Sequence, residues 1–313
     1  MRIPTIIGSL LACSVAVLAR NPAIPGLYAD PNIVSFDGTY YVYTTTDGFA
    51  GWGGQTFYVW YSKDLATWNR TQEPILTLDG EKGNVPWANG NAWAPTIVKR
   101  GCTYYLYFSG NNTLLNTKTI GVASAPSPLG PFTAQPEPMI TNDEDISTGQ
   151  AIDPAAFVDP KTGKYYLFWG NGSPLMAELA DDMLSLKNGS IQKVVGLTNF
   201  TEASFVVYRE PYYHYTFSTG DTGKADYYVG YGTATDVAGP WEYRGKILQQ
   251  DPAQGILSTG SSSNVMVPGT DDWYIAYHRW AIPGGDGQHR EVCLDKLQFD
   301  NESGLILTVQ PTL

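Results

Sequence analysis

The chain is poor in histidine, in cysteine and in positively charged residues. Its 313 residues include only three histidines and three cysteines, and no H-E-x-x-H motif occurs. The sequence therefore gives no support for a histidine-based zinc centre. Lys and Arg total 19 against 30 acidic residues, a formal net charge of −11. Nucleic acid and anionic membranes are excluded as partners, because both bind through clustered cations. A neutral ligand such as a sugar suits this charge.

Long hydrophobic runs are also missing after the first residues. The apolar stretch at 6–18 is too short to span a bilayer. It follows a positively charged start and ends at Val-Leu-Ala, residues 17–19, which suits a signal-peptidase site. We predict a secretory signal peptide at residues 1–19 and a secreted mature chain at 20–313, with a buried N-terminal helix as the alternative.

The cysteines and the asparagine sequons indicate which covalent modifications the exported chain could carry. Cleavage removes Cys13 and leaves Cys102 and Cys293, which either form a disulfide or lie as separate thiols in different strands. Six N-x-S/T sequons predict glycosylation if the secreting cell is eukaryotic. They begin at Asn69, Asn111, Asn171, Asn188, Asn199 and Asn301.

What the chain has in abundance is aromatic residues, with 21 tyrosines and 9 tryptophans. Many of them fall in a repeated strand-like run that follows a Gly, Pro or Asp turn. The copies are TYYVYTTT at 39, TYYLYFSG at 103, KYYLFWGN at 164, YYHYTFST at 212 and WYIAYHRW at 273. A repeat of roughly 60 residues with several short strands predicts an all-β fold, a five-bladed β-propeller in a single domain. A β-sandwich is the alternative, and it leaves the repeat unexplained.

Three carboxylic acids lie about ten residues before an aromatic run, at the start of the preceding strand. They are Asp30, Asp153 and Glu202, and the other two copies have neutral residues there. In a propeller this strand is the innermost one, so its start lies near the central axis. Asp30 beside Pro31 is also a common turn sequence, but three turn acids in one register by chance is a poor explanation. We therefore predict that the three acids converge.

Converging carboxylates repel one another, so at least one has a raised pKa. Cleavage of a glycosidic bond needs this arrangement, because one acid must stay protonated while another stays ionised. A cation site is the competing interpretation, since calcium prefers oxygen ligands, but the sequence has no EF-hand loop.

The motifs around these acids resemble glycoside hydrolase family 43, five-bladed propeller enzymes that act on arabinan and xylan. GLYADPNI, AIDPAAF and FTEASFVV match three family motifs, and NAWAPTIV and QHREVCLD resemble further segments. The resemblance implies that Asp30 is the general base, Glu202 the general acid, and Asp153 the residue that orients Glu202 and raises its pKa. It also implies inversion, with Asp30 and Glu202 roughly 6.5–9.5 Å apart. Ala203-Ser204 replaces the Gly-Pro that follows the acid in many members, which affects the pocket around the leaving group.

Four further residues are candidates for binding. Trp93 and Trp52, the latter in the loop GFAGWGGQ, are predicted to stack on sugar, with core packing as the alternative for Trp93. Arg290 resembles a family arginine that reaches the substrate, and a salt bridge at the rim is its alternative. His278 resembles a family histidine that helps hold calcium or a water cluster in the axial channel. A hydrogen-bonded core histidine is the alternative for His278.

The resemblance predicts a secreted inverting glycosidase that removes terminal α-L-arabinofuranosyl residues from arabinan or arabinoxylan. A β-xylosidase is the first alternative, followed by an endo-arabinanase and a carbohydrate-binding propeller without turnover. We expect a monomer whose partner is a plant cell-wall polysaccharide. We expect no required cofactor, and calcium is considered only as a structural ion.

Overall fold

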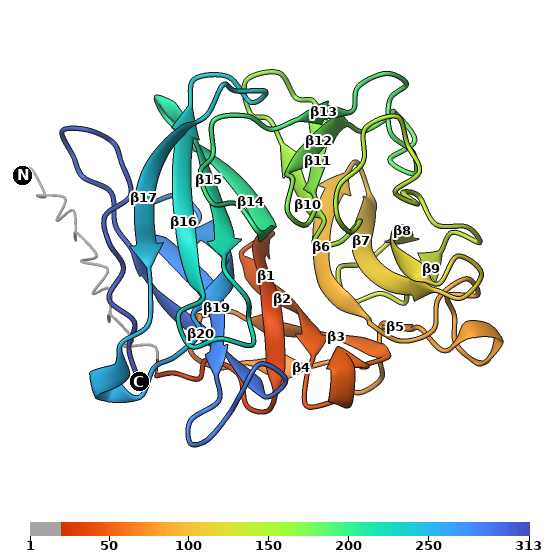
Figure 1. Ribbon diagram of the computed structural model, residues 1–313, viewed down its shortest axis with the longest axis horizontal. Coiled ribbons are helices and arrows are strands. Elements are labelled where there is room, and N and C mark those ends of the chain that lie inside the picture. Colours follow the sequence, from red (N-terminus) through yellow and green to blue (C-terminus); the bar gives the residue numbers. More distant parts are fainter. Residues whose placement is uncertain (1–19) are drawn as a thin grey trace, which may run out of the picture.

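The computed structural model describes residues 20–313, which form five sheets around one axis (Figure 1). Blade one contains β1 (Tyr28–Phe36), β2 (Thr39–Thr46), β3 (Thr56–Ser62), β4 (Asn69–Arg70) and β5 (Leu76–Thr77). Blade two contains β6 (Trp93–Arg100), β7 (Thr103–Asn112), β8 (Thr117–Ala125) and β9 (Thr133–Ala134). Blade three contains β10 (Ala155–Val158), β11 (Tyr165–Trp169), β12 (Leu175–Glu178) and β13 (Gln192–Lys193). Blade four contains β14 (Glu202–Arg209), β15 (Tyr212–Thr219), β16 (Tyr228–Ala234) and β17 (Glu242–Leu248). Blade five contains β18 (Gly260–Met266), β19 (Trp273–Trp280) and β20 (Arg290–Leu297). The short 3₁₀ helices within these residues are η1 (Ala50–Trp52), η2 (Gly80–Lys82) and η3 (Pro252–Gln254).

The all-β fold with five blades in a single domain is therefore confirmed. The predicted signal peptide, residues 1–19, lies outside the described residues. Along residues 20–313 no helix is both long enough and apolar enough to cross a bilayer.

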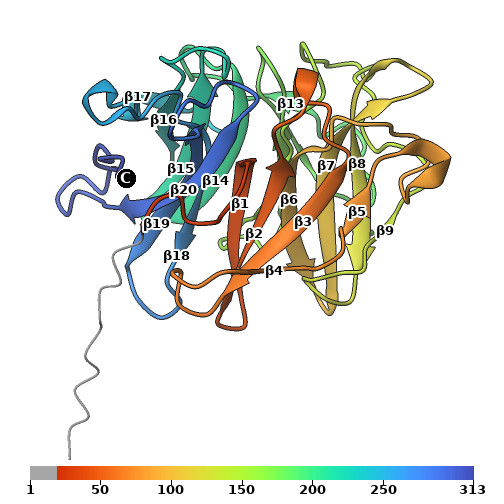
Figure 2. The same ribbon diagram turned by 90° about the horizontal axis from the view of Figure 1, so that it is seen from below.

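The inner strands β1, β6, β10, β14 and β18 contact one another in ring order around the axis (Figures 1 and 2). Each blade is covered on both faces, so the hydrophobic core consists of layers between adjacent blades. The repeated aromatic residues fill these layers. Trp87 stacks on Phe108 with ring centroids 5.9 Å apart, and Phe168 meets Tyr215 edge-on at 5.5 Å. Aromatic side chains suit this position because each buries a large apolar area.

The first described residues close the ring against blade five. The Ala23 amide donates a hydrogen bond of 2.8 Å to the Val292 carbonyl on β20. The Asn21 side chain accepts from the Leu294 amide at 2.8 Å and donates to Thr312 Oγ1 at 3.0 Å. The two ends of the described chain are therefore held on the same blade.

A β-bulge marks the start of four inner strands. The pairing register shifts after Ala29 on β1, Trp93 on β6, Glu202 on β14 and Gly260 on β18. At each inner-strand start one residue adopts a positive φ, namely Asp30, Ala94, Asp153, Ala203 and Ser261. A bulge adds an unpaired residue and re-aims the side chains around it, which is why bulges recur beside active sites.

This register corrects one detail of the sequence prediction. Asp30 and Asp153 occupy equivalent positions, whereas Glu202 lies one residue earlier, in the position of Trp93. Counting ten residues back from the aromatic pair gave the wrong register for Glu202, because the aromatic pair of blade four lies one residue earlier on its strand than the pair of blade one. Thr39 pairs with the last residue of β1, and its counterpart in blade four is Tyr212, which pairs with the last residue of β14.

Candidate active site

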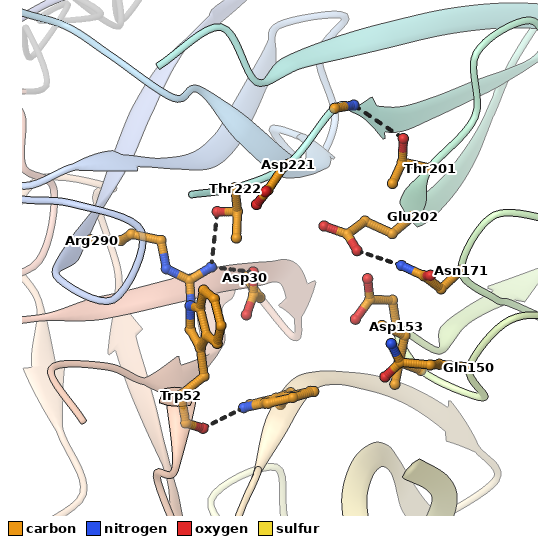
Figure 3. Close-up of a pocket in the computed structure, with 13 residues that line it drawn as sticks. Asp30, Trp52, Gln150, Asp153, Asn171, Thr201, Glu202, Asp221, Thr222 and Arg290 are labelled. Carbon is orange, nitrogen blue, oxygen red and sulfur yellow. Dashed lines mark hydrogen bonds and ion pairs between the residues drawn. The ribbon is translucent and has the colours of Figure 1, made fainter. Parts of the chain in front are cut away.

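One cavity of about 330 Å³ lies where the inner strands begin (Figure 3). Six residues singled out from the sequence line it together: Asp30, Trp52, Trp93, Asp153, Glu202 and Arg290. The seventh, His278, is fully buried beside Asp30, with its Nδ1 atom 3.2 Å from Asp30 Oδ1. The structure therefore brings all of the predicted site residues to one end of the axis.

Contacts between neighbouring blades hold the starts of the inner strands in place. In all five blades a side chain of the preceding blade around the ring accepts the amide hydrogen of the residue with positive φ. The pairs are Asp30 N to His278 Nδ1 (3.3 Å), Ala94 N to Thr45 Oγ1 (2.9 Å), Asp153 N to Ser109 Oγ (3.0 Å), Ala203 N to Asp153 Oδ2 (3.1 Å) and Ser261 N to Ser218 Oγ (2.8 Å). Asp153 is the one acceptor in this set that also lines the cavity, so it fixes the backbone next to Glu202 directly.

Asp30 is held as a carboxylate. Thr45 Oγ1 donates to its Oδ2 atom at 2.6 Å, and Arg290 Nη1 lies 3.5 Å from Oδ1. Burial alone would raise the pKa of Asp30. The Arg290 charge and the contacts with His278 and Thr45 outweigh burial and hold that pKa well below its ordinary value. Asp30 is therefore ionised across the neutral range.

His278 is a neutral ring with a protein partner at each nitrogen. Burial and the nearby Arg290 charge lower the pKa of His278, so the ring is neutral. The Asp30 amide donates to Nδ1 at 3.3 Å, and the Asp30 carboxylate lies 3.2 Å from the same atom. Arg290 donates to Thr222 Oγ1 at 3.4 Å, and this hydroxyl lies within hydrogen-bond distance of His278 Nε2, at 3.2 Å.

Arg290 is buried inside the site rather than exposed at its rim. Its Nε and Nη2 atoms donate to the two oxygens of Asp47 at 2.8 and 3.2 Å, and only 4% of its side chain is exposed. Such a two-point pair fixes the guanidinium plane. The rim salt bridge considered for Arg290 is therefore wrong. Its partner Asp47 comes from the loop after β2, 243 positions away in sequence, and nothing in the sequence indicated the pairing.

Glu202 accepts two hydrogen bonds that orient its carboxyl group. Tyr227 donates to Oε1 at 2.9 Å. Asn171 donates to Oε2 at 2.8 Å (Figure 3). Burial raises the pKa of Glu202, and the Asp30 charge adds to this, while the two hydrogen bonds oppose it. The pKa of Asp153 is also raised, by burial and by the charges of Glu202 and Asp30. The cavity thus has one ionised carboxylate facing two carboxyl groups that retain protons more strongly.

The two tryptophans form a connected wall. Trp93 Nε1 donates to the Trp52 carbonyl at 2.7 Å, and Trp52 Nε1 donates to the Gly287 carbonyl at 2.6 Å. Both side chains are partly exposed and line the cavity. The alternative of core packing for Trp93 is therefore not what the structure shows. Their nitrogen atoms are occupied, so the ring faces are what they can offer a ligand.

Several residues of the site were missed in the sequence. Asn171, Gln150, Thr201, Asp221 and Thr222 line the cavity from loops between strands. Asn171 had been noted only as a sequon. Its amide nitrogen donates to Glu202, so a glycan on that nitrogen would displace a contact inside the cavity. Loop residues of this kind carry no periodic signal.

Cys102 and Cys293 are both free thiols, the first exposed and the second buried. Cys102 lies in the turn between β6 and β7, whereas Cys293 lies within β20 of another blade. The disulfide considered for this pair is therefore absent, and the alternative of two separate thiols holds.

The residues around His278 do not fit a metal ion bound by protein side chains. Both ring nitrogens face protein partners, Asp30 and Thr222, and the ring stacks on Tyr227 at 5.8 Å. From residue 20 to the C-terminus, no group of three or more His, Cys, Asp or Glu side chains is arranged to hold an ion. The geometry matches the alternative considered for His278, a hydrogen-bonded core histidine. We derive no step through a metal.

An ionised carboxylate opposite a protonated acid is the arrangement needed to hydrolyse a glycosidic bond. Residues 19–304 match the model of glycosyl hydrolases family 43. The chain belongs to this family, and it is a glycoside hydrolase.

Individual relatives agree on the family but differ in substrate. The chain is 36% identical over 312 residues to a β-D-galactofuranosidase of Aspergillus niger, which covers 94% of this chain and 86% of that protein. It is 27% identical to the xylosidase/arabinosidase 43A of Humicola insolens, covering 93% and 99% of the two chains. A solved β-xylosidase/α-arabinofuranosidase from a compost microbial metagenome, in complex with xylotriose and in a calcium-free form, superposes with a TM-score of 0.80 at 26% identity. That match covers 94% of this chain and 98% of the other.

Proposed function

We propose that the chain is a secreted, inverting glycosidase that removes terminal α-L-arabinofuranosyl residues from arabinan or arabinoxylan. The observation that carries the proposal is the opposed pair of carboxyl groups in one cavity: the pKa of Asp30 is lowered while that of Glu202 is raised. A protein that only binds sugar has no need for this difference, since binding requires no proton donor.

The proposed reaction is a single displacement. Glu202 donates its proton to the glycosidic oxygen as the bond to the anomeric carbon breaks. Asp30 accepts a proton from a water molecule whose oxygen attacks the opposite face of that carbon. The products are the inverted free sugar and the shortened chain. Glu202 is left ionised and Asp30 protonated, and proton exchange with solvent restores both.

The neighbouring residues have supporting roles in this scheme. Asp153 accepts from the Ala203 amide and so orients the backbone that carries Glu202. The Glu202 charge contributes to the raised pKa of Asp153, so the two carboxyl groups oppose each other's ionisation. Arg290 keeps Asp30 ionised and lines the cavity, where we expect it to contact a sugar hydroxyl. Trp52 and Trp93 stack against the sugar rings.

The relatives bear on which sugar is removed. Relatives named xylosidase/arabinosidase support an arabinofuranosyl or xylosyl residue, so a β-xylosidase remains the first alternative. Relatives named endo-arabinosidases keep internal cleavage of arabinan as another alternative.

A β-D-galactofuranosyl residue is a second candidate, favoured by the 36% identical relative. L-Arabinofuranose and D-galactofuranose share the configuration of their ring carbons, and galactofuranose carries an additional hydroxymethyl group outside the ring. A pocket that accepts the first sugar needs only extra room at one end to accept the second.

Hydrolysis of three nitrophenyl glycosides by wild type and Glu202→Gln tests the proposal. The substrates are the α-L-arabinofuranoside, the β-D-xyloside and the β-D-galactofuranoside. Arabinofuranoside turnover that is lost in the variant supports the main proposal. A preference for either other substrate replaces the sugar but keeps the chemistry, and no turnover of any glycoside or of linear arabinan overturns it. Proton NMR of the first product tests inversion, which predicts that the β-anomer of arabinose appears first.

The proposal extends to the processing, location, oligomeric state and cofactor requirement of the enzyme. We propose that the mature enzyme begins after residue 19, acts outside the cell as a monomer on plant cell-wall polysaccharide, and needs no cofactor for its chemistry. Activity that persists unchanged after dialysis against a chelator is the expected result for the last point.

A further inference from the structure

Asp47 is a buried acid to which the proposed reaction gives no step. It is the first residue after β2, and only 1% of its side chain is exposed. Its amide donates to the carbonyl of Leu27 at 3.1 Å, directly before β1, so its backbone is tied to the strand that carries Asp30. A buried charge is costly unless it has a close partner. For Asp47 that partner is Arg290.

Asp47 occupies one whole edge of the Arg290 guanidinium. Nε donates to Oδ2 at 2.8 Å and Nη2 donates to Oδ1 at 3.2 Å, while the Arg290 amide also donates to Oδ2 at 3.0 Å. Because the guanidinium is planar, fixing the edge that contains Nε and Nη2 also fixes the direction of Nη1. Nη1 is the atom directed at the proposed base, Asp30 (Figure 3).

The two acids hold Arg290 unequally. Its shortest contact with Asp47 is 2.8 Å, whereas Nη1 lies 3.5 Å from Asp30 Oδ1. A close pair between a guanidinium and a carboxylate has its atoms about 2.7–2.9 Å apart. The third partner, Thr222 Oγ1, is also distant, at 3.4 Å. The contacts with Asp47 therefore decide where the guanidinium lies.

This unequal sharing matters for a general base. A carboxylate in a close pair with arginine is strongly stabilised in its ionised form, so it accepts a proton less readily. At 3.5 Å the Arg290 charge still holds the pKa of Asp30 low. The longer distance avoids a close pair that would compete with water for Asp30 Oδ1.

The other titratable groups around Arg290 offer it no second close anion. Within residues 20–313 its ion-pair partners are Asp30 and Asp47. Burial raises the pKa of Tyr227 and lowers that of His278, so both side chains are neutral. The two carboxyl groups across the cavity lie apart from Arg290 (Figure 3) and retain their protons more strongly. Without the Asp47 charge, the guanidinium would therefore be drawn to Asp30.

We propose that Asp47 is a positioning residue for the general base, which holds the Arg290 guanidinium back from Asp30 and so leaves Asp30 available to the attacking water. This role rests on the proposed function, because it assumes that Asp30 is the base. Asp47 acts through Arg290 and needs no contact with the substrate.

Asp47→Asn tests the proposal, since it removes the charge and keeps the size of the side chain. We expect a crystal structure of the variant to show Nη1 about 2.8 Å from Asp30, closer than in the wild type. On a nitrophenyl glycoside we expect kcat to fall about tenfold with little change in KM, because the base is weakened and binding is not. Asp286→Asn is the matched control, and it should change neither value. Asp286 lies in the loop that faces Asp47 and pairs with the exposed His289.

Arg290→Gln with and without Asp47→Asn tests whether Asp47 acts through Arg290. We expect these two variants to have the same kcat/KM and the same acidic limb of the pH profile, because Asp47 then has no guanidinium to position. The double variant removes both members of a buried charge pair, so we expect it to fold even if Asp47→Asn alone does not.

An unmoved guanidinium or an unchanged kcat in Asp47→Asn overturns the proposal. An acidic limb displaced to higher pH in that variant also overturns it, since Asp47 would then be bringing Arg290 towards Asp30. A difference between Arg290→Gln and the double variant would show that Asp47 acts independently of Arg290. If the wild type hydrolyses no glycoside, the proposed function fails, and the position of the guanidinium in the two structures still decides the role of Asp47.

Discussion

The two ends of the propeller axis are built from the same five inner strands but differ in chemistry. We call the end where the inner strands start the upper end. There Asp30, Asp153 and Glu202 line a cavity of about 330 Å³. Towards the opposite, lower end, residues such as Ile97 and Val98 in the second half of β6 line a largely apolar cavity of about 450 Å³. Between them the axis narrows to a space of only about 30 Å³. The two ends are therefore chemically separate.

The connections differ in the same way. At the lower end, β1 and β2, β6 and β7, and β14 and β15 are joined by the short turns 37–38, 101–102 and 210–211. At the upper end, the loops 47–55, 220–227 and 281–289 are longer and supply Trp52, Thr222 and, at the start of β20, Arg290. A rigid scaffold with one functional rim follows from this asymmetry, because loops vary in sequence at little cost to the core. We therefore expect substitutions at the lower end to change stability and substitutions at the upper end to change the chemistry.

The largest expected effect comes from neutralising a charge at the upper end. Asp30→Asn removes the proposed proton acceptor, so we expect kcat to fall about 10²–10⁴-fold. Asp37→Asn is the matched control, since Asp37 lies in the turn at the far end of β1 and pairs only with Lys99 in the described chain. The kcat values of the two variants on a nitrophenyl glycoside should differ. An equal loss of kcat in both would contradict the idea that only the upper end carries the chemistry.

A smaller effect is expected from Arg290→Lys. The guanidinium holds the pKa of Asp30 low, so a weaker partner allows that pKa to rise. Because the proposed mechanism requires ionised Asp30 to accept the proton from water, the acidic limb of the kcat/KM profile should move to higher pH. A lost charged hydrogen bond of about 1.5–3 kcal/mol corresponds to roughly 10–100-fold in kcat/KM. Arg209→Lys, at an exposed pair with Asp271, is the control and should leave the profile unchanged.

Asn171→Ala should shift the opposite limb. The Asn171 amide stabilises ionised Glu202, so its loss raises the pKa of Glu202 further. Since the proposed mechanism requires protonated Glu202, the basic limb of the profile should move to higher pH. Loss of one hydrogen bond of about 1 kcal/mol should lower kcat about fivefold. Asn188→Ala removes an exposed asparagine that also begins a sequon, and a shift in that control would point to lost glycosylation instead.

The smallest effects concern stability and have opposite signs at the two ends. The pKa of Asp153 is raised in the folded state, so the folded protein binds this proton more tightly than the unfolded chain. Ionisation of Asp153 therefore costs the folded state more free energy than the unfolded state. This loss of stability grows as pH rises from about 4, the ordinary pKa of Asp, through the raised pKa of the folded state. Asp153→Asn should therefore increase Tm by about 2 °C at neutral pH.

At the lower end, Ile97→Val removes one buried methylene and should cost about 0.5–1.5 kcal/mol with kcat unchanged. Thermal unfolding monitored by circular dichroism measures both variants. A lower Tm for Asp153→Asn would show that its hydrogen bond from Ala203 outweighs the charge repulsion.

How far the site could be foreseen depended on the kind of residue. Asp30 and Asp153 were found because each precedes a repeated strand, and repetition shows in the sequence. Glu202 was also found, but its register position on the inner strand was predicted one residue away from the observed one. The pairing of β14 with β15 cannot be counted from aromatic residues alone. Asp47, Tyr227 and the pocket role of Asn171 were missed, since each acts through a partner that is distant in sequence.

The sequence by itself determined the architecture and the acids. Alternating aromatic runs with short turns admit little besides stacked blades, because each sheet must bury both of its faces. It also carried the motif in which each acid lies. Only the tertiary structure decided the electrostatics, since the pKa of a carboxyl group depends on burial and on charges that arrive from other blades. Asp30 and Glu202 are both carboxylic acids. The neighbouring Arg290 charge lowers the pKa of Asp30, whereas burial raises the pKa of Glu202.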